Sequence, residues 1–190
     1  MRRQTDSAEL WVNPRVPDDG FLFEPSAYGA DVEAILALVD HGRRLLPLVM
    51  EGNANEAGRE KLRGVSASKL FAGARAPEAA MSGLYVYFSC FDEAHNIAQD
   101  IPTAEGSYWH AIVHRQEPDA GNSSYWFRQV GAHPIYSALA RAAGGAASWD
   151  PFGFIEQCET ARRNPGSDLE SRVRALQRLE WQLLFDYCAR

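Results

Sequence analysis

The sequence contains no long apolar run. No stretch approaches the roughly 18 uninterrupted apolar residues that a membrane-spanning helix needs. The first residues of the chain are polar, and the apolar segment of a secretory signal does not follow them. We therefore expect a cytoplasmic protein that has no membrane partner.

Cysteine is scarce as well. Cys90, Cys158 and Cys188 are odd in number, far apart in the chain and outside any C-x-x-C pair. This pattern argues against a disulfide framework and against a zinc knuckle. We expect three reduced, buried thiols, which agrees with a cytoplasmic location.

Clusters of basic residues and phosphate-binding loops are also missing. The formal net charge is −6, and the 19 Lys and Arg residues are scattered along the chain. A nucleic-acid-binding domain normally carries a basic stripe, so we expect no nucleic acid partner. Apolar residues at 46% and charged residues at 23% indicate a globular protein, and 190 residues suffice for one domain with a sizeable core.

Strand-like alternation does not persist beyond a few residues, and helical periodicity dominates. The sequence predicts an all-α fold: a single-domain helical bundle of six to eight helices that spans residues 1–190. One or two of them are short helices between residues 53 and 76. From Pro, Gly and capping residues, the longer helices are expected from Asp31 towards Pro47, from Pro77 through Phe91, from Ser107 to Gln116, from Asp119 or Asn122 to Gly131, from His133 to Gly144, from Asp150 to Asn164, and from Ser167 onwards.

Residues 1–30 are expected to form an extended, irregular arm on this bundle. Residues 10–29 contain three prolines and two glycines among large apolar side chains that include Trp11, Phe21 and Phe23. Such a segment cannot continue a regular helix. We expect the arm to pack on the body of the protein through its aromatic side chains.

The first candidate site residues follow the apolar stripe of the helix that begins at Pro77. The stripe leads through Phe88 and Phe91 directly to Asp92 and His95, which are three residues apart. If both were buried they would need partners, and an imidazole is a natural partner of a carboxylate. The alternative is that the helix simply emerges into water at this point.

The second candidate pair lies on the helix Ser107–Gln116. His110 and His114 are four residues apart and so share one face of the helix, with Glu117 close to the same stripe. Two such histidines can chelate one metal ion, and a nearby carboxylate can complete the ligand set or act as a general base. The same histidines also fit metal-free acid–base chemistry, anion binding, or a purely structural role.

Many polar and aromatic side chains follow within a short stretch. Each has an ordinary structural use, such as a helix cap, but together they are typical of a pocket for a small polar ligand. The ligand-binding candidates are Arg115, Asp119, Asn122, Tyr125, Trp126 and His133.

The same region resembles an uncharacterised protein family of bacteria and fungi. The resemblance is carried by Phe91–His95, by Tyr108–Asp119, and by residues 121–134 with the sequence GNSSYWFRQVGAHP. It covers about a quarter of the chain, and Gln116 stands where the family pattern has a second Arg. No activity is assigned to that family, so the resemblance implies no mechanism.

Three functions are compatible with these observations. The first is a small-molecule enzyme in which Asp92, His95, His110, His114 and Glu117 meet between two helices, with metal-assisted hydrolysis as the reaction class. In this reading His95, His110 and His114 would hold a divalent metal. The second is a non-catalytic module that binds a small anion or sugar, and the third is a structural or interaction protein whose polar cluster is internally satisfied. The sequence indicates no oligomeric state.

Overall fold

A computed structural model of the protein describes residues 21–144 and 148–190. These residues form ten α-helices and two short 3-10 helices but no strand, which confirms the all-α prediction. None of these helices is long and apolar enough to cross a membrane. In chain order the elements are η1 Pro25–Tyr28, α1 Ala30–Leu36, η2 Asp40–Gly42, α2 Glu56–Leu62, α3 Ala67–Leu70, α4 Pro77–Tyr87, α5 Phe91–Gln99, α6 Ala104–Gln116, α7 Ala120–Val130, α8 Tyr136–Ala142, α9 Pro151–Arg163 and α10 Asp168–Ala189.

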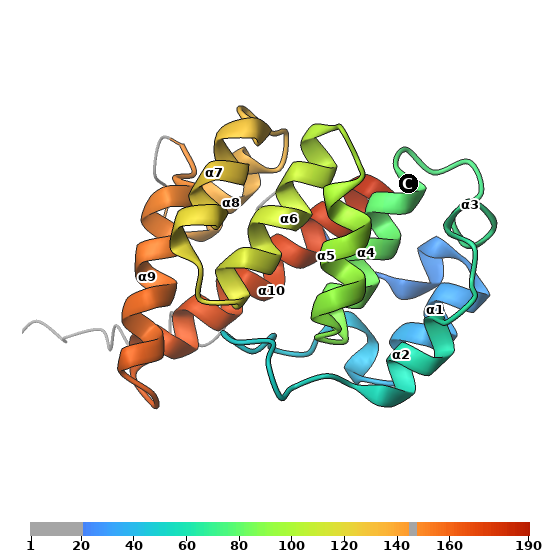
Figure 1. Ribbon diagram of the computed structural model, residues 1–190, viewed down its shortest axis with the longest axis horizontal. Coiled ribbons are helices and arrows are strands. Elements are labelled where there is room, and N and C mark those ends of the chain that lie inside the picture. Colours follow the sequence, from blue (N-terminus) through green and yellow to red (C-terminus); the bar gives the residue numbers. More distant parts are fainter. Residues whose placement is uncertain (1–20, 145–147) are drawn as a thin grey trace, which may run out of the picture.

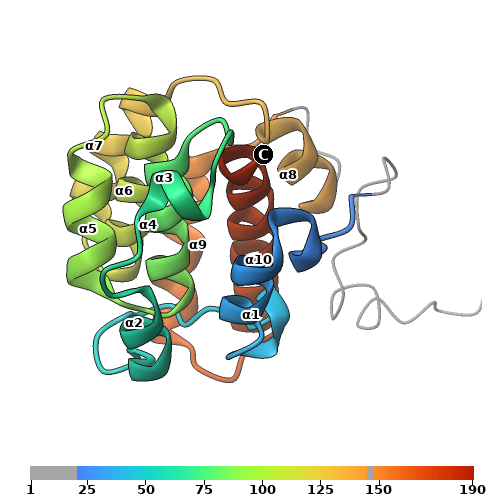
Figure 2. The same cartoon turned by 90° about the vertical axis from the view of Figure 1, so that its right-hand side faces the viewer.

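The longest helix, α10, runs across the bundle behind α4 and α6 (Figure 1). Figure 2 shows that α5 and α7 lie on the side of α4 and α6 that faces away from α10. Helix α6 is therefore enclosed between neighbours, and all of its residues from Gly106 to Gln116 are buried. A helix that is buried all round must satisfy its polar side chains inside the protein.

Close approach of α6 to α4 depends on a glycine. A Cβ atom built on Gly83 would lie 2.7 Å from the indole ring of Trp109, so a larger residue would push α6 away. The carbonyl oxygen of Gly83 also accepts a hydrogen bond of 2.7 Å from the Trp181 indole on α10. One position on α4 thus joins the three central helices.

The aromatic arm packs on the body as predicted for the part that the structure describes. Phe23 lies 5.3 Å from the ring of Trp181, and Tyr28 lies 5.1 Å from the ring of Phe185, both on α10. The arm is not wholly extended, because η1 forms within it. Trp11 lies outside the described residues.

The prediction of one helix from Asp31 towards Pro47 is wrong in length, since α1 ends at Leu36. The hydroxyl group of Tyr87, at the end of α4, donates to the carbonyl of Val39 and accepts from the amide of Gly42. Gly42 has a φ of +78°, which glycine adopts without strain. A long-range contact that local periodicity does not reveal therefore redirects the chain.

The continuous apolar stripe predicted from Pro77 to His95 is also interrupted. The chain breaks at Ser89, which has a φ of +57°, and α5 begins at Phe91 as a separate helix. The break turns α5 back against α4, where Ala94 and Ala98 are buried. This split is one reason why there are more helices than six to eight.

Most of the predicted helix ends are confirmed. The side chains of Asp119, Asp150 and Ser167 cap α7, α9 and α10, and Gly131 is the residue that ends α7. Helix α6 starts three residues earlier than predicted, because the side chain of Thr103 caps it. Apart from the start of α6, these helix ends could be predicted from the capping residues in the sequence.

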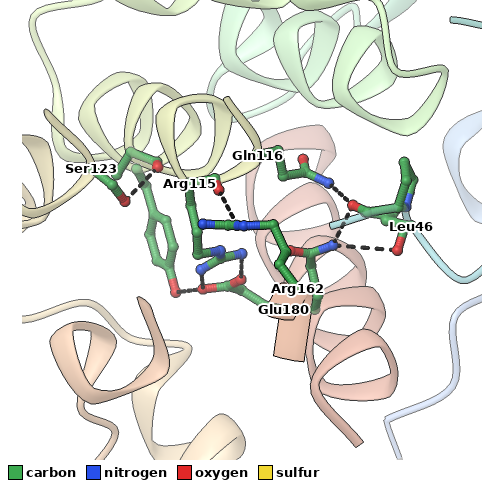
Figure 3. A network of polar contacts seen from close by, with 10 residues as sticks. Leu46, Arg115, Gln116, Ser123, Arg162 and Glu180 are labelled. Carbon is green, nitrogen blue, oxygen red and sulfur yellow. Dashed lines mark hydrogen bonds and ion pairs between the residues drawn. The ribbon is translucent and has the colours of Figure 1, made fainter. Parts of the chain in front are cut away.

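A buried ion pair joins α6 to α10. Arg115 and Glu180 are 1% and 0% exposed, and both terminal nitrogens of the guanidinium bind the carboxylate (Figure 3). The hydroxyl group of Tyr108, which lies two turns before Arg115 on α6, donates to the same carboxylate at 3.1 Å. Burial raises the pKa of Tyr108 well above its ordinary value, so the hydroxyl stays protonated and available as a donor.

The irregular segment 45–50 is held by side chains of the helices around it. The amide groups of Gln116 and Gln177 both donate to the carbonyl of Pro47. Arg162 of α9 donates to the carbonyl of Leu48. It also donates to the carbonyl of Arg115 (Figure 3). These bonds satisfy backbone groups of a segment that has no helix or sheet of its own.

The three cysteines are free and buried, as predicted. Burial raises the pKa of Cys90 and of Cys158 to about 11. The thiols are therefore protonated near neutral pH and behave as small apolar side chains.

The pair Arg115–Glu180 gives a stability prediction. Removing one partner leaves a buried charge without compensation, so Arg115→Met or Glu180→Leu should each cost about 3–5 kcal/mol of unfolding free energy. The double variant should lose less than the two single variants together, because it leaves neither charge behind. Urea denaturation measures all three.

The exposed pair Arg63–Glu60, with nitrogen and oxygen 3.3 Å apart, is the matched control. Its removal should change the unfolding free energy by less than about 1 kcal/mol. Strictly additive losses at Arg115 and Glu180 would contradict the coupling described above.

Candidate metal centre

Two serine hydroxyls fix the helices that carry the candidate histidines. Ser82 of α4 donates to the carbonyl of Ala94 at 3.0 Å, and Ser123 of α7 donates to the carbonyl of Ala111 at 2.8 Å. These carbonyls belong to residues that directly adjoin His95 and His110 in the chain. The histidine-bearing turns of α5 and α6 are thus tied to the helices on either side.

The connection between α5 and α6 is equally tight. A Cβ atom built on Gly106 would lie 2.3 Å from the carbonyl oxygen of Ile101. Gly106 therefore allows the first turn of α6 to rest on the end of α5. The short connection and this contact bring the two helices side by side, as their predicted pairing required.

His95 of α5 and His110 and His114 of α6 form one cluster. The ring centre of His95 lies 4.5 Å from that of His110 and 5.1 Å from that of His114, and the two rings on α6 are 4.8 Å apart. One ring nitrogen from each histidine can be chosen so that all three lie within 4.8 Å of one another. The structure thus brings together the three histidines that the sequence nominated as metal ligands.

His110 lies deepest in the cluster and has no hydrogen bond. It is 3% exposed, and neither of its ring nitrogens has a partner among the described residues. Burial, together with the neighbouring His95 and His114, lowers the pKa of His110 to about 4. The imidazole is therefore neutral at pH 7, which is the form that binds metals.

His114 has a carboxylate partner. Its Nδ1 atom lies 2.8 Å from Oε2 of Glu117, three residues further along the chain. A carboxylate on one ring nitrogen fixes the tautomer and leaves Nε2 for another ligand. Glu117 is thus placed to orient His114. A carboxylate oxygen of Asp119 also lies within 4.8 Å of ligand atoms of His114 and Glu117.

Two aromatic side chains flank the cluster. Trp126 of α7 stacks on His110 with ring centres 4.1 Å apart, and Phe91 of α5 stacks on His95 at 5.6 Å. Trp126, Phe91 and His95 are each half-buried, whereas His110 and His114 are buried. Solvent therefore reaches the cluster along the edge formed by His95 and the two aromatic rings.

Asp92 is exposed and belongs to neither group of candidate ligand atoms. Of the two alternatives for Asp92 and His95, the structure favours the one in which the helix emerges into water at Asp92, because the chain break at Ser89 sets the first turn of α5 at the surface. His95 itself is half-buried. Burial lowers the pKa of His95, and the charge of His114 acts in the same direction.

The residues proposed for a small-ligand pocket lie in different surroundings. Arg115 is committed to Glu180 in the core, and Asn122 bonds the carboxylate of Asp119 at the start of α7. His133 lies among tyrosines, with its ring centre 4.9 Å from that of Tyr187. The structure does not bring these residues together with Trp126 into one pocket.

Tyr125, the remaining candidate, is 51% exposed and contacts Trp126 edge to face. One surface hollow, of about 430 Å³, lies beside Leu45, Arg174 and Arg178. Sequence reasoning missed Phe91 as part of the site. Its position four residues before His95, on the same helix face, is the signal that could have indicated it.

Comparisons of the chain with protein families, curated proteins and solved structures found no match. The resemblance to an uncharacterised family stays a prediction. The site is therefore argued from its own geometry and chemistry.

His133 gives a prediction on pH. Burial lowers its pKa to about 4, while the unfolded chain has a histidine pKa of about 6.5. Between these values the unfolded state binds a proton that the folded state does not, so stability falls as pH drops from about 6.5 to about 4. The loss from this residue is on the order of 3 kcal/mol.

His133→Asn keeps an acceptor for the amide of Ile135, which lies 3.4 Å from Nδ1 of His133, but cannot take up a proton. The unfolding free energy of this variant should fall less steeply with decreasing pH than that of the wild type. Denaturation series at pH 7.5, 6, 5 and 4.5 measure the difference, and parallel curves would refute a buried, neutral His133.

Proposed function

We propose that the protein binds a divalent metal ion through His95, His110 and His114 and uses it for metal-assisted hydrolysis of a small substrate. The observation that carries the proposal is His110, a buried imidazole with two unpartnered nitrogens in the middle of a three-histidine cluster. An unpartnered buried polar group costs about 1–3 kcal/mol. A metal ligated by His110 would offset this cost.

The donor set favours ions that accept nitrogen ligands. Imidazole suits zinc, copper, nickel and iron, whereas magnesium and calcium prefer oxygen. A zinc-type ion held by three histidines keeps one position open and lowers the pKa of bound water to about 7, which is the chemistry of hydrolysis. Glu117 would hold His114 in the tautomer that presents Nε2.

The cluster fits an ion after a small adjustment. Tetrahedral zinc with Zn–N distances of about 2.0–2.1 Å sets its nitrogens about 3.3 Å apart. The candidate atoms lie within 4.8 Å of one another, so each pair of nitrogens would approach by at most about 1.5 Å. Half-buried His95 has the freedom to make most of this movement.

The other two functions have less support. The small-ligand module would need Arg115, Asn122, Tyr125, Trp126 and His133. Of these, Arg115 is paired with Glu180 in the core and Asn122 bonds the carboxylate of Asp119. An internally satisfied structural cluster would require hydrogen bonds to His110, and the described residues supply none.

Elemental analysis tests the metal directly. Protein purified without a His-tag or chelator should contain about one equivalent of zinc, copper, iron or nickel, or should take it up from a metal salt. The double variant His110→Ala, His114→Ala should lose the metal, because it removes two of the three ligands.

The matched control is His133→Asn, which removes a buried histidine outside the cluster. It should retain the metal. Absence of metal from the wild type after incubation with metal salts, or equal loss in the control, would rule out the proposed site.

His110→Leu separates metal binding from stability. Leucine has a similar volume and no polar atoms, so the metal-free variant should be as stable as the wild type or more stable by about 1–2 kcal/mol. It should bind metal at least about tenfold more weakly. Thermal unfolding with chelator and with added metal measures both effects. A destabilisation of more than about 2 kcal/mol with chelator would instead indicate a structural role for the imidazole.

A further inference from the structure

We propose that the open position of this centre takes a small organic anion of single negative charge with an apolar or aromatic body, such as a monocarboxylate. The inference rests on the proposed metal site and names the class of ligand that the site accepts. Three features of the structure carry it: the charge of the donor set, the acidic groups around it, and the aromatic walls of its accessible edge.

The donor set leaves positive charge uncompensated. Three imidazoles are neutral ligands, so a divalent ion held by His95, His110 and His114 keeps its charge of +2. Glu117 bonds His114, and a carboxylate oxygen of Asp119 lies within 4.8 Å of ligand atoms of both, but neither carboxylate belongs to the group formed by the three histidines. An anion at the open position is therefore favoured over a neutral ligand.

The surroundings disfavour ligands of higher negative charge. Glu117 and Asp119 lie beside His114, and Asp92 lies one turn before His95. The basic residues of α5, α6 and α7 point elsewhere: Arg115 binds Glu180, and Arg128 lies over the ring of Phe152 on α9. A phosphate dianion would meet carboxylates here and no guanidinium of α5, α6 or α7, whereas such anions are usually bound by arginine or lysine.

The accessible edge is aromatic. His110 and His114 are buried, whereas His95, Phe91 stacked on it, and Trp126 stacked on His110 are half-buried, so a ligand would approach the cluster on this side. Aromatic side chains partly exposed at the entrance of a site contribute apolar contact to a ligand that passes between them. A carboxylate with an apolar body can thus bind the ion through its oxygen and the two rings through its carbon skeleton.

Cobalt(II) is the probe for this inference, because its visible absorption reports on the groups that bind it. The full chain is loaded with cobalt and titrated separately with acetate, benzoate and inorganic phosphate. We expect benzoate to change the spectrum at concentrations at least about tenfold lower than acetate. Phosphate should have no effect over the range in which acetate binds.

The aromatic walls are tested with Trp126→Leu and Phe91→Leu. Each should retain cobalt and its response to acetate, while the preference for benzoate over acetate falls several-fold. Phe21→Leu removes a half-buried aromatic ring of the N-terminal segment, which is not part of the histidine cluster, and should leave the preference unchanged.

The outcomes distinguish the two proposals. If cobalt does not bind, or binds equally to the His110→Ala, His114→Ala variant, the metal site fails and this inference falls with it. If cobalt binds at the histidines but no anion changes the spectrum, only the inference is overturned. Stronger binding of phosphate than of benzoate would also overturn it, as would a benzoate preference that persists in both aromatic variants.

Discussion

Complete burial of α6 is the constraint on which the rest of the structure depends. This helix lies between α4, α5, α7 and α10, yet it carries polar residues along its whole length. Each of them must find a partner inside the protein or lower its stability. Arg115 obtains Glu180 from α10, Gln116 obtains the carbonyl of Pro47, and His114 obtains the carboxylate of Glu117. The long-range organisation of the bundle follows largely from these pairings.

His110 departs most clearly from this rule, because both of its ring nitrogens lack a partner, whereas Arg115 and Gln116 each have one unpartnered atom beside their bonded ones. The guanidinium of Arg115 is paired with Glu180, whose carboxylate is buried in the core. The imidazole of His110, by contrast, has no hydrogen bond. The surrounding helices could have supplied an acceptor, as α10 does for Arg115. Instead α5 supplies a third imidazole and α7 supplies the flat face of Trp126. Buried polar groups that lower the stability of the folded protein are concentrated at binding sites and active sites.

The same architecture explains why the polar residues of the segment from Arg115 to His133 do not act together. Helical geometry sends neighbouring side chains in different directions, so His114 faces α5 while Arg115 faces α10. Asp119 and Asn122 are used at the start of α7, and His133 lies beyond its end among tyrosines. Density of polar residues in a sequence is therefore a weak indication of a pocket. Spacing on a single helix face is a stronger one.

The sequence by itself determined the helical class, the capped helix ends, the buried thiols and the pairing of His110 with His114, because periodicity, capping and i,i+4 spacing are local properties. It could not show that the apolar stripe that begins at Pro77 breaks at Ser89. The break goes with the packing of α5 against α4 and α6, and such tertiary contacts leave no local pattern. The sequence also could not show whether Arg115 forms an ion pair or lines a pocket, because its partner Glu180 is 65 residues away in the chain. Only the tertiary structure brought His95 to the two histidines of α6. The contacts that do so, through Ser82, Gly106 and Ser123, join residues on different elements and leave no periodic signal in the chain.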